Sequence, residues 1–154
     1  MPTPSHIAKL RAFVGHDLLL MPSVSVLPLD DDGRLLLVRE AGLDTWSTLG
    51  GAVEIGETPA QAAVRESHEE LGIGVRLTRL LDVLGGPDYE VTYPNGDRVA
   101  YVVSAYEARI AEGTPFVNDG ELRDFGWFTL AELPGQPLSR LARALLTDTG
   151  IIPG

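Results

Sequence analysis

The chain contains no cysteine, so disulfide bonds and thiolate metal sites are both excluded, and the redox compartment cannot be inferred from cysteine usage. No apolar run approaches the roughly 18 residues that a membrane-spanning helix needs. Because no charged stretch followed by an apolar segment begins the chain, we expect no signal peptide and a cytoplasmic location. The sequence also lacks a Walker loop and the motifs Gly-x-Ser-x-Gly and Gly-x-Gly-x-x-Gly, which argues against three common enzyme classes.

Basic residues are scarce as well. The chain has 12 lysines and arginines against 22 aspartates and glutamates, which gives a formal net charge of −10. Proteins that bind long nucleic acids need basic side chains to meet the phosphates, so a nucleic-acid polymer is not an expected partner. A small nucleotide is compatible with this charge, because it can bind together with a divalent cation. The length of 154 residues suits one domain over residues 1–154 with a sizeable core.

One segment, residues 51–73, combines the signals of a helix with many carboxylates. Thr58 is a good N-cap, Pro59 suits the first helical position, and Gly72 is a typical helix end. We therefore predict a helix between Thr58 and Gly72. Helical spacing predicts that five of its residues face the core: Ala60, Ala63, Val64, Ser67 and Leu71.

Three glutamates of this helix, Glu66, Glu69 and Glu70, are three and four residues apart, so their side chains gather on one patch. Like charges at this spacing destabilise a helix by roughly 0.2–0.5 kcal/mol per pair. Arg65 can offset part of this repulsion by pairing with Glu69 or Glu57. Hard cations such as Mg²⁺ and Mn²⁺ prefer oxygen ligands and share their coordination with substrate phosphates, so the cluster predicts metal-assisted attack on a phosphate ester or anhydride. A solvated acidic face is the alternative.

The segment GAVEIGETPAQAAVRESHEELGI resembles the Nudix box, G-x5-E-x7-R-E-U-x-E-E-x-G-U, in which U is a bulky apolar residue. All seven fixed residues are present: Gly51, Glu57, Arg65, Glu66, Glu69, Glu70 and Gly72. Two positions depart from the pattern, since Ser67 occupies the first U and Leu49 stands where many members have proline. We expect the Ser67 hydroxyl to bond to the carbonyl of Ala63, one turn earlier. The resemblance covers about residues 20–147.

The resemblance implies an α/β (α+β) Nudix fold, with a mixed β-sheet sandwiched between α-helices. It also implies a metal site formed by Glu66, Glu69, Glu70 and the carbonyl of Gly51. In this family the arginine of the box orients the glutamates, so Arg65 takes that role and Glu57 pairs with it.

The sequence does not decide which residue acts as the general base. Glu66 is the candidate within the box, whereas some family members take the base from a later loop. In this chain that loop carries Asp119 and Glu121, and Glu121 is the stronger candidate outside the box. The alternative for Glu121 is a solvated loop carboxylate. The number of metal ions and the phosphorus that is attacked also stay open.

Residues that contact the substrate are expected next to the box. Gly50 and Gly51 are expected to approach the diphosphate, and Trp46 and Tyr89 are candidates to stack on a base. Tyr93 and Phe116 are further aromatic candidates, and for each of the four the alternative is packing in the core or in a hairpin. The YPNGD sequence at 93–97 resembles that of a bacterial Nudix subgroup of undefined substrate. ADP-ribose, dinucleoside polyphosphates, nucleotide sugars and oxidised nucleoside triphosphates therefore all remain candidates.

Outside the box, the hydrophobic pattern predicts strands and helices in alternation. A helix over 5–14, capped by Ser5, is expected to pack on the domain or on a partner subunit, so a homodimer stays open. Strands are expected at 18–29, 34–39, 75–83, 90–93, 99–107 and 122–128, followed by a helix at 138–146. The first two are expected to form a hairpin around the turn at 30–33, and a polar loop is expected over 111–120.

Together these features predict an enzyme that hydrolyses the diphosphate linkage of a nucleoside diphosphate derivative with the help of Mg²⁺ or Mn²⁺. Two alternatives remain at this point. One is a catalytically silent nucleotide-binding or regulatory module on the same fold, and the other is a structural acidic domain. The complete set of box carboxylates favours the enzyme, because binding alone does not require four of them.

Overall fold

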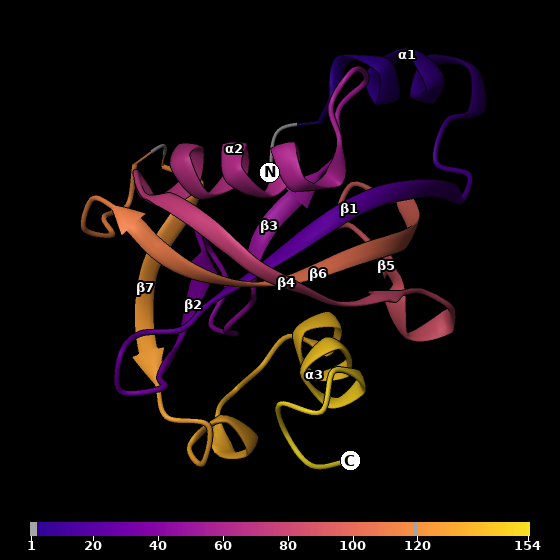
Figure 1. Cartoon of the computed structure of the whole chain (residues 1–154). Helices are drawn as coiled ribbons and strands as arrows, with labels where there is room; N and C mark the ends of the chain where they lie inside the picture. Colours follow the sequence, from indigo (N-terminus) through magenta and orange to yellow (C-terminus); the bar gives the residue numbers. More distant parts are fainter. Residues whose placement is uncertain (1–2, 119) are drawn as a thin grey trace.

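The computed structural model describes residues 3–118 and 120–154 and is built around a five-stranded mixed sheet (Figure 1). The order along the sheet is β3-β1-β6-β4, and β5 pairs with the first part of β6. β1 and β6 run parallel, whereas the other pairs are antiparallel. The strands are β1 (Leu19–Pro28), β3 (Leu49–Ala52), β4 (Gly74–Leu84), β5 (Glu90–Thr92) and β6 (Arg98–Glu112).

A second, two-stranded sheet is formed by β2 (Leu35–Glu40) and β7 (Leu122–Phe128). The expected hairpin between β1 and β2 is therefore only partly correct. The turn at 30–33 is present, but the two strands enter different sheets and meet only at an isolated bridge between Leu29 and Leu35. β2 instead pairs with β7, and buried side chains of both strands are divided between the two apolar clusters of the protein.

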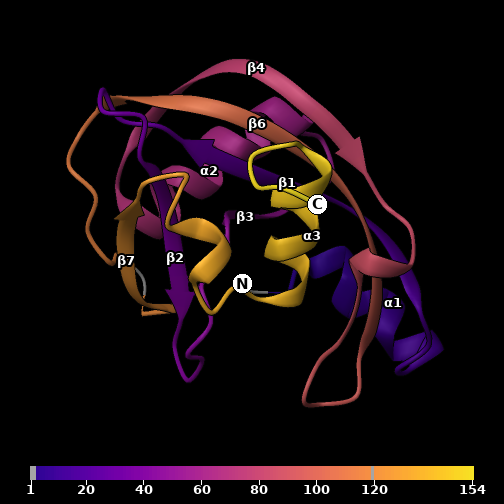
Figure 2. The ribbon, with the colours of Figure 1, turned by 90° about the horizontal axis from the view of Figure 1, so that it is seen from below.

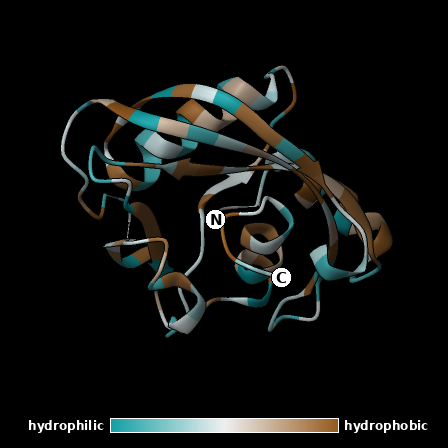
Figure 3. Ribbon diagram, turned by 60° about the horizontal axis from the view of Figure 1, so that its bottom comes forward, coloured by the Kyte–Doolittle hydropathy of each residue, from teal (hydrophilic) through white to brown (hydrophobic). Residues whose placement is uncertain are grey.

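Helices cover both faces of the main sheet, which confirms the predicted α/β/α arrangement. α2 (Pro59–Leu71) lies on one face and α3 (Arg140–Asp148) on the other (Figures 1 and 2). One cluster of buried apolar residues lies beneath α2 and a second beneath α3. Figure 3 shows hydrophobic stretches along the strands between these layers. Two short 3₁₀ helices, Pro87–Tyr89 and Leu133–Gly135, complete the set of elements in the described residues.

The hairpin of β5 and β6 forms as predicted, around a turn at 93–97 that is closed by hydrogen bonds between Tyr93 and Asp97 and between Gly96 and Tyr93. β6 is longer than predicted and continues to Glu112, because residues 109–112 still pair with β4 after the pairing with β1 has ended at Ala108. The loop expected to begin at Ala111 therefore begins after Glu112.

α1 (Ser5–Val14) has the predicted bounds and ends at Gly15, whose φ of 61° suits glycine. The predicted cap is wrong, because Pro4 occupies the N-cap position and no side chain caps the helix. Ile7 is its buried residue, and Phe13 is 89% exposed. No helix among residues 3–118 and 120–154 is long and apolar enough to cross a membrane.

Candidate metal and phosphate site

The helix that carries the carboxylates, α2, is fixed at both ends by the residues that the sequence indicated. Thr58 accepts a hydrogen bond from the backbone N–H of Gln61, and the Gln61 side chain accepts one from the N–H of Thr58, which forms a capping box. Pro59 follows the cap, and Gly72 ends the helix at φ 64°. A Cβ atom on Gly72 would lie 2.3 Å from the Phe116 ring, so this position needs glycine for space as well as conformation.

The buried face of α2 is rotated relative to the prediction. Ala63, Ser67 and Leu71 are fully buried as expected, whereas Ala60 and Val64 are exposed. The face instead includes Ala62 and two carboxylates, Glu66 and Glu70, which are only 4% and 5% exposed. α2 packs against β3, β4 and β1. Glu70 lines a cavity together with Gly50 and Gly51 of β3, and Glu66 lines a second one together with Ala52.

Ser67, which departs from the family pattern, forms the hydrogen bond predicted from the sequence. Its hydroxyl donates a hydrogen bond of 2.8 Å to the carbonyl of Ala63 within the same helix. The polar group is thereby satisfied although the residue is fully buried. The second departure, Leu49, is also fully buried, and its side chain belongs to the core beneath α2.

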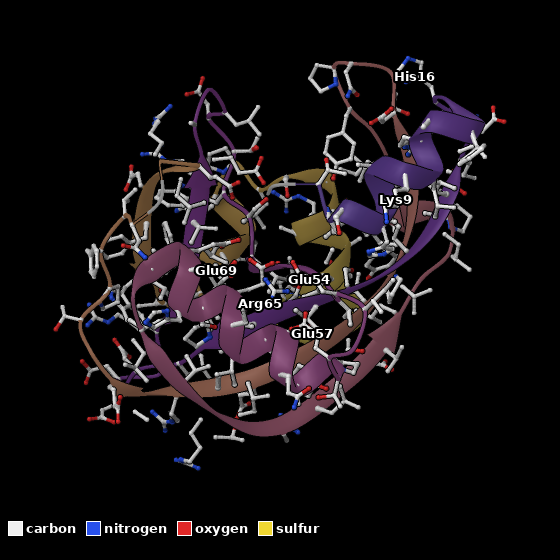
Figure 4. All side chains as sticks on the ribbon, turned by 90° about the horizontal axis from the view of Figure 1, so that it is seen from above. Lys9, His16, Glu54, Glu57, Arg65 and Glu69 are labelled. Carbon is white, nitrogen blue, oxygen red and sulfur yellow. The ribbon has the colours of Figure 1, made fainter. Side chains whose placement is uncertain are left out.

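Arg65 links the carboxylates of the site to one another (Figure 4). Its guanidinium donates two hydrogen bonds to Glu57, of 3.0 and 2.6 Å, and one of 3.1 Å to each of Glu66 and Glu69. A further bond of 3.0 Å reaches the carbonyl of Ala52 at the end of β3. Arg65 therefore connects the helix, the loop that precedes it and the sheet.

Within this network, the pKa values of Glu57 and Glu66 are shifted in opposite directions. The hydrogen bond from Arg65 lowers the pKa of Glu57, and a backbone N–H bond from Glu54 adds to the effect. Burial raises the pKa of Glu66 above its ordinary value, although Arg65 acts against this increase and Glu69 adds to it. The bond to Glu57 raises the pKa of Arg65, so the guanidinium stays charged. Glu66 thus keeps a buried carboxyl group that is costly to ionise without a nearby positive charge.

The glycines before the helix allow the sheet backbone to come close. Gly50 and Gly51 pair with Ser25 and Val24 of β1. A Cβ atom on Gly50 would lie 2.1 Å from the carbonyl oxygen of Val24, so no larger residue fits without displacement of the backbone. This packing leaves the backbone of both glycines along a cavity wall.

Two neighbouring cavities adjoin the site, and both are bordered by Thr3 and Pro4. The first, which we call the acidic cavity, has a volume of about 350 Å³ and is lined by Glu54, Arg65, Glu66 and Glu69, among others. The second, which we call the side cavity, has a volume of about 440 Å³. Its lining includes Gly50, Gly51, Glu70 and Glu121 at one end and the turn at 93–97 at the other.

Glu121 therefore lies beside the same cavity as Glu70, although the two are far apart in the sequence. This position keeps Glu121 as a candidate base outside the box. Asp119, its companion in the sequence prediction, lies outside the described residues.

Neither aromatic residue favoured as a stacking partner lines these cavities. Trp46 is 9% exposed, packs edge to face on Phe128 with ring centroids 4.9 Å apart, and carries the Arg39 guanidinium 4.2 Å above its ring. Tyr89 is 1% exposed, and its hydroxyl donates a 2.8 Å hydrogen bond to Asp148. Their positions correspond to the alternative of core packing, because neither ring presents a face to a ligand.

Tyr93, a minor candidate on sequence, does line the side cavity. The structure adds residues that the sequence analysis did not single out: Arg11, Glu40, Asp97 and Tyr101. They come from α1, the end of β2, the turn at 93–97 and β6. A helix beginning at Ser5 and a turn at 93–97 were both visible in the sequence, but nothing there indicated that they meet.

The residues present suit a hard divalent cation in chemistry. Buried Glu66 and Glu70, with the half-exposed Glu69 and the backbone of Gly51, provide oxygen donors without sulfur or imidazole. Within the described residues, no group of three acidic or histidine side chains is already arranged to hold a metal ion. Two of the three glutamates are ion-paired with Arg65, so binding of a cation requires rotation of these side chains.

Comparison with known families matches residues 19–147 to the NUDIX domain. The chain is 32% identical over 130 residues to the NAD-capped RNA hydrolase NudC of Pseudomonas aeruginosa, covering 82% of this chain and 43% of that protein. It is 47% identical over 53 residues to the RNA pyrophosphohydrolase of Halorhodospira halophila, covering 34% of this chain and 29% of that protein. The chain thus spans less than half the length of these two relatives.

Among solved structures, the crystal structure of a MutT NUDIX hydrolase from Burkholderia pseudomallei superposes with a TM-score of 0.68 at 30% identity. The match covers 83% of this chain and 96% of that one. α1 lies before the region matched to the domain model and is part of the wall of both cavities.

Proposed function

Because this chain belongs to the Nudix family, we propose that it hydrolyses the diphosphate linkage of a nucleoside diphosphate derivative with the help of Mg²⁺ or Mn²⁺. The observation that carries this proposal is the convergence of Glu66 and Glu70, both nearly buried, with Gly50 and Gly51 beside two adjoining cavities. Burial of two neighbouring carboxylates is costly unless positive charge compensates it; Arg65 supplies part of that charge to Glu66, and a divalent cation would add to it.

In this proposal Glu66, Glu69 and Glu70 hold the metal, together with the carbonyl of Gly51. When bound, a divalent cation polarises phosphoryl oxygens and stabilises negative charge on the leaving phosphate. Arg65 keeps the glutamates in position, and Glu57 fixes Arg65 through two hydrogen bonds.

The proton of the attacking water passes to a carboxylate, for which Glu66 and Glu121 are the two candidates. Glu66 fits because it lines the acidic cavity and is nearly buried there, beside Glu69. Glu121 fits because it lies beside the side cavity with Glu70.

Replacement of the metal-binding carboxylates tests the proposal most directly. We expect Glu69→Gln and Glu70→Gln each to lower turnover by at least about 100-fold, since charge stabilisation of this kind contributes factors of that order. The assay is a hydrolysis panel of ADP-ribose, dinucleoside polyphosphates, nucleotide sugars and oxidised nucleoside triphosphates with Mg²⁺ or Mn²⁺. Product masses after reaction in ¹⁸O-water identify the phosphorus that is attacked.

Glu132→Gln provides the matched control, because Glu132 is exposed and does not line either cavity. Normal turnover in both Glu69→Gln and Glu70→Gln would remove this helix from the catalytic site. If the wild-type protein binds nucleotides but hydrolyses none of the panel, the silent nucleotide-binding module replaces the enzyme.

The remaining parts of the proposal concern partners and location. NudC, by its name, acts on NAD-capped RNA, whereas we propose a small nucleotide as the substrate of this chain, on the basis of its net charge of −10. We also propose a cytoplasmic location and one domain that includes α1. Size-exclusion chromatography with light scattering decides whether the chain forms a homodimer.

A further inference from the structure

The side cavity extends beyond the part that the proposed hydrolysis requires. Besides Gly50 and Glu70, its lining includes the end of β2, the first residues of β6, α1 and the turn at 93–97. Its volume of about 440 Å³ lies within the usual range of small-molecule sites. A group joined to a diphosphate at the metal site can therefore enter it.

The charged groups of this extension disfavour a second anionic group. Four carboxylates line the side cavity, those of Glu40, Glu70, Asp97 and Glu121, against one guanidinium, that of Arg11. The Arg11 guanidinium already donates hydrogen bonds to the carbonyls of Gly15, Asp17 and Arg98, at 3.0, 2.5 and 2.8 Å. It is thus committed to the protein backbone, and the extension suits an uncharged group.

Glu40 differs from the other acidic groups of the cavity. Asp97 is bonded to His16 at 2.7 Å and to Asn95 at 3.2 Å, whereas the Glu40 carboxylate makes no hydrogen bond or ion pair with any other described residue. A shift of the strand register at Arg39 and Glu40 interrupts the pairing of β2 with β7 at this point, and such irregularities redirect side chains next to binding sites. Glu40 therefore offers two acceptor oxygens to the cavity.

Two tyrosines adjoin this acceptor. The hydroxyl groups of Tyr93 and Tyr101 are hydrogen-bonded to each other, and both residues line the cavity. Their pKa values are raised, chiefly by burial, and the negative charge of Glu40 contributes to both. Tyr93 is 38% exposed and lines the cavity, so it can contact a planar ligand.

We propose that the side cavity holds the nucleobase of the substrate, and that Glu40 selects bases with an exocyclic amino group. An amino group donates hydrogen bonds to a carboxylate, whereas the carbonyl oxygen at the equivalent position of uracil or hypoxanthine is repelled by it. The inference rests on the proposed function, because it assigns the nucleoside half of the same substrate. It adds a specificity-determining residue that lies outside the box.

Binding of nucleoside monophosphates tests this selectivity without any hydrolysis. CMP and UMP differ at the amino group, as do AMP and IMP, while each pair shares its sugar and phosphate. We expect the Kd of CMP to be about tenfold lower than that of UMP, and the Kd of AMP about tenfold lower than that of IMP, by isothermal titration calorimetry at one fixed Mg²⁺ concentration. In Glu40→Gln both ratios should fall below about threefold, since the amide both donates and accepts.

Glu132→Gln should keep the wild-type ratios, and thermal melting of each variant confirms that it is folded. Ratios near one in the wild-type protein, no measurable binding of any of the four nucleotides, or ratios unchanged in Glu40→Gln would each overturn the proposal. The hydrolysis panel separates the two hypotheses: turnover without base preference refutes only the role of Glu40. Base preference without turnover supports the nucleobase cavity and refutes hydrolysis.

Discussion

The two helices that border the cavities, α1 and α2, are attached to the sheet by different kinds of contact. α2 has a capping box at its start, a left-handed glycine at its end and six buried residues. α1 has no side-chain cap and one buried residue, Ile7. It is held instead by Arg11 and His16, which bond to the carbonyl of Arg98 and the carboxylate of Asp97.

The carboxylates on α2 and the part of the cavity wall formed by α1 are therefore held in place by different interactions. Two of the α2 carboxylates, those of Glu66 and Glu70, are nearly buried in the packed face of the helix, so changes to them affect the stability of the core. α1 is held mainly by polar bonds at the surface, and such elements open locally at a lower free energy than the whole protein. The carboxylate cluster of α2 and the wall of the side cavity should therefore respond differently to mutation.

The largest expected effect on stability comes from Arg65→Met. This substitution removes every hydrogen bond that joins Glu57, Glu66 and Glu69 to the guanidinium. The nearly buried Glu66 then loses the positively charged side chain that pairs with it. Breaking a buried ion pair from one side costs about 3–5 kcal/mol, so we expect a loss of about 3 kcal/mol in the free energy of unfolding. Urea denaturation at pH 7 measures it.

Arg79→Met is the control, because Arg79 forms an exposed pair with Glu107 and should change stability by less than about 1 kcal/mol. A loss in Arg65→Met as small as that of the control would show that α2 does not depend on its charge network.

A smaller and local effect is expected from Arg11→Met. Loss of the bond to the carbonyl of Arg98, which joins α1 to β6, should detach α1 more often, so hydrogen exchange of its backbone amides should become about tenfold faster. Exchange in α2 should stay at the wild-type rate. Mass spectrometry of peptides from each helix provides the measurement.

Lys9→Met is the matched control on the same helix, since Lys9 is exposed. Equal acceleration in α1 and α2, or no acceleration in either, would remove the distinction between the two helices.

The smallest effect concerns the pH dependence of Glu57. Its pKa is lowered from 4.5 in the folded protein by Arg65, so the stabilisation is fully present above pH 4.5 and is lost as the pH falls through the lowered pKa. Glu57→Gln should therefore be less stable than wild type by about 1 kcal/mol at pH 7. Urea denaturation from pH 7 to pH 3 should show the two curves converging below pH 4.5; a constant difference would contradict the assignment.

Local signals in the sequence predicted α2 and the sandwich fold well. The N-cap at Thr58 and the end at Gly72 depend on neighbouring residues, and the bond from Ser67 to Ala63 depends on one helical turn. The rotation of the buried face depends instead on which strands lie beneath the helix. The exposure of Val64 and the burial of Glu66 could not be read from spacing alone.

The site beyond the box was the least predictable part. Trp46 is close to Gly50 in the sequence and was expected to stack on a base, yet its ring packs between Arg39 and Phe128. Glu40 gave no signal, because a single charged residue at the end of a strand is ordinary in a sequence. Its significance depends on the cavity, which combines segments distant along the chain.

The parallel pairing of β1 with β6 has a consequence for synthesis of the chain. β3, which carries Gly50 and Gly51, pairs with β1, and the other edge of β1 has no partner until β6 is complete at Glu112. Pairing between strands so far apart in sequence forms slowly, and an unpaired strand edge favours aggregation. On the ribosome, α2 therefore emerges long before the sheet that supports it can close.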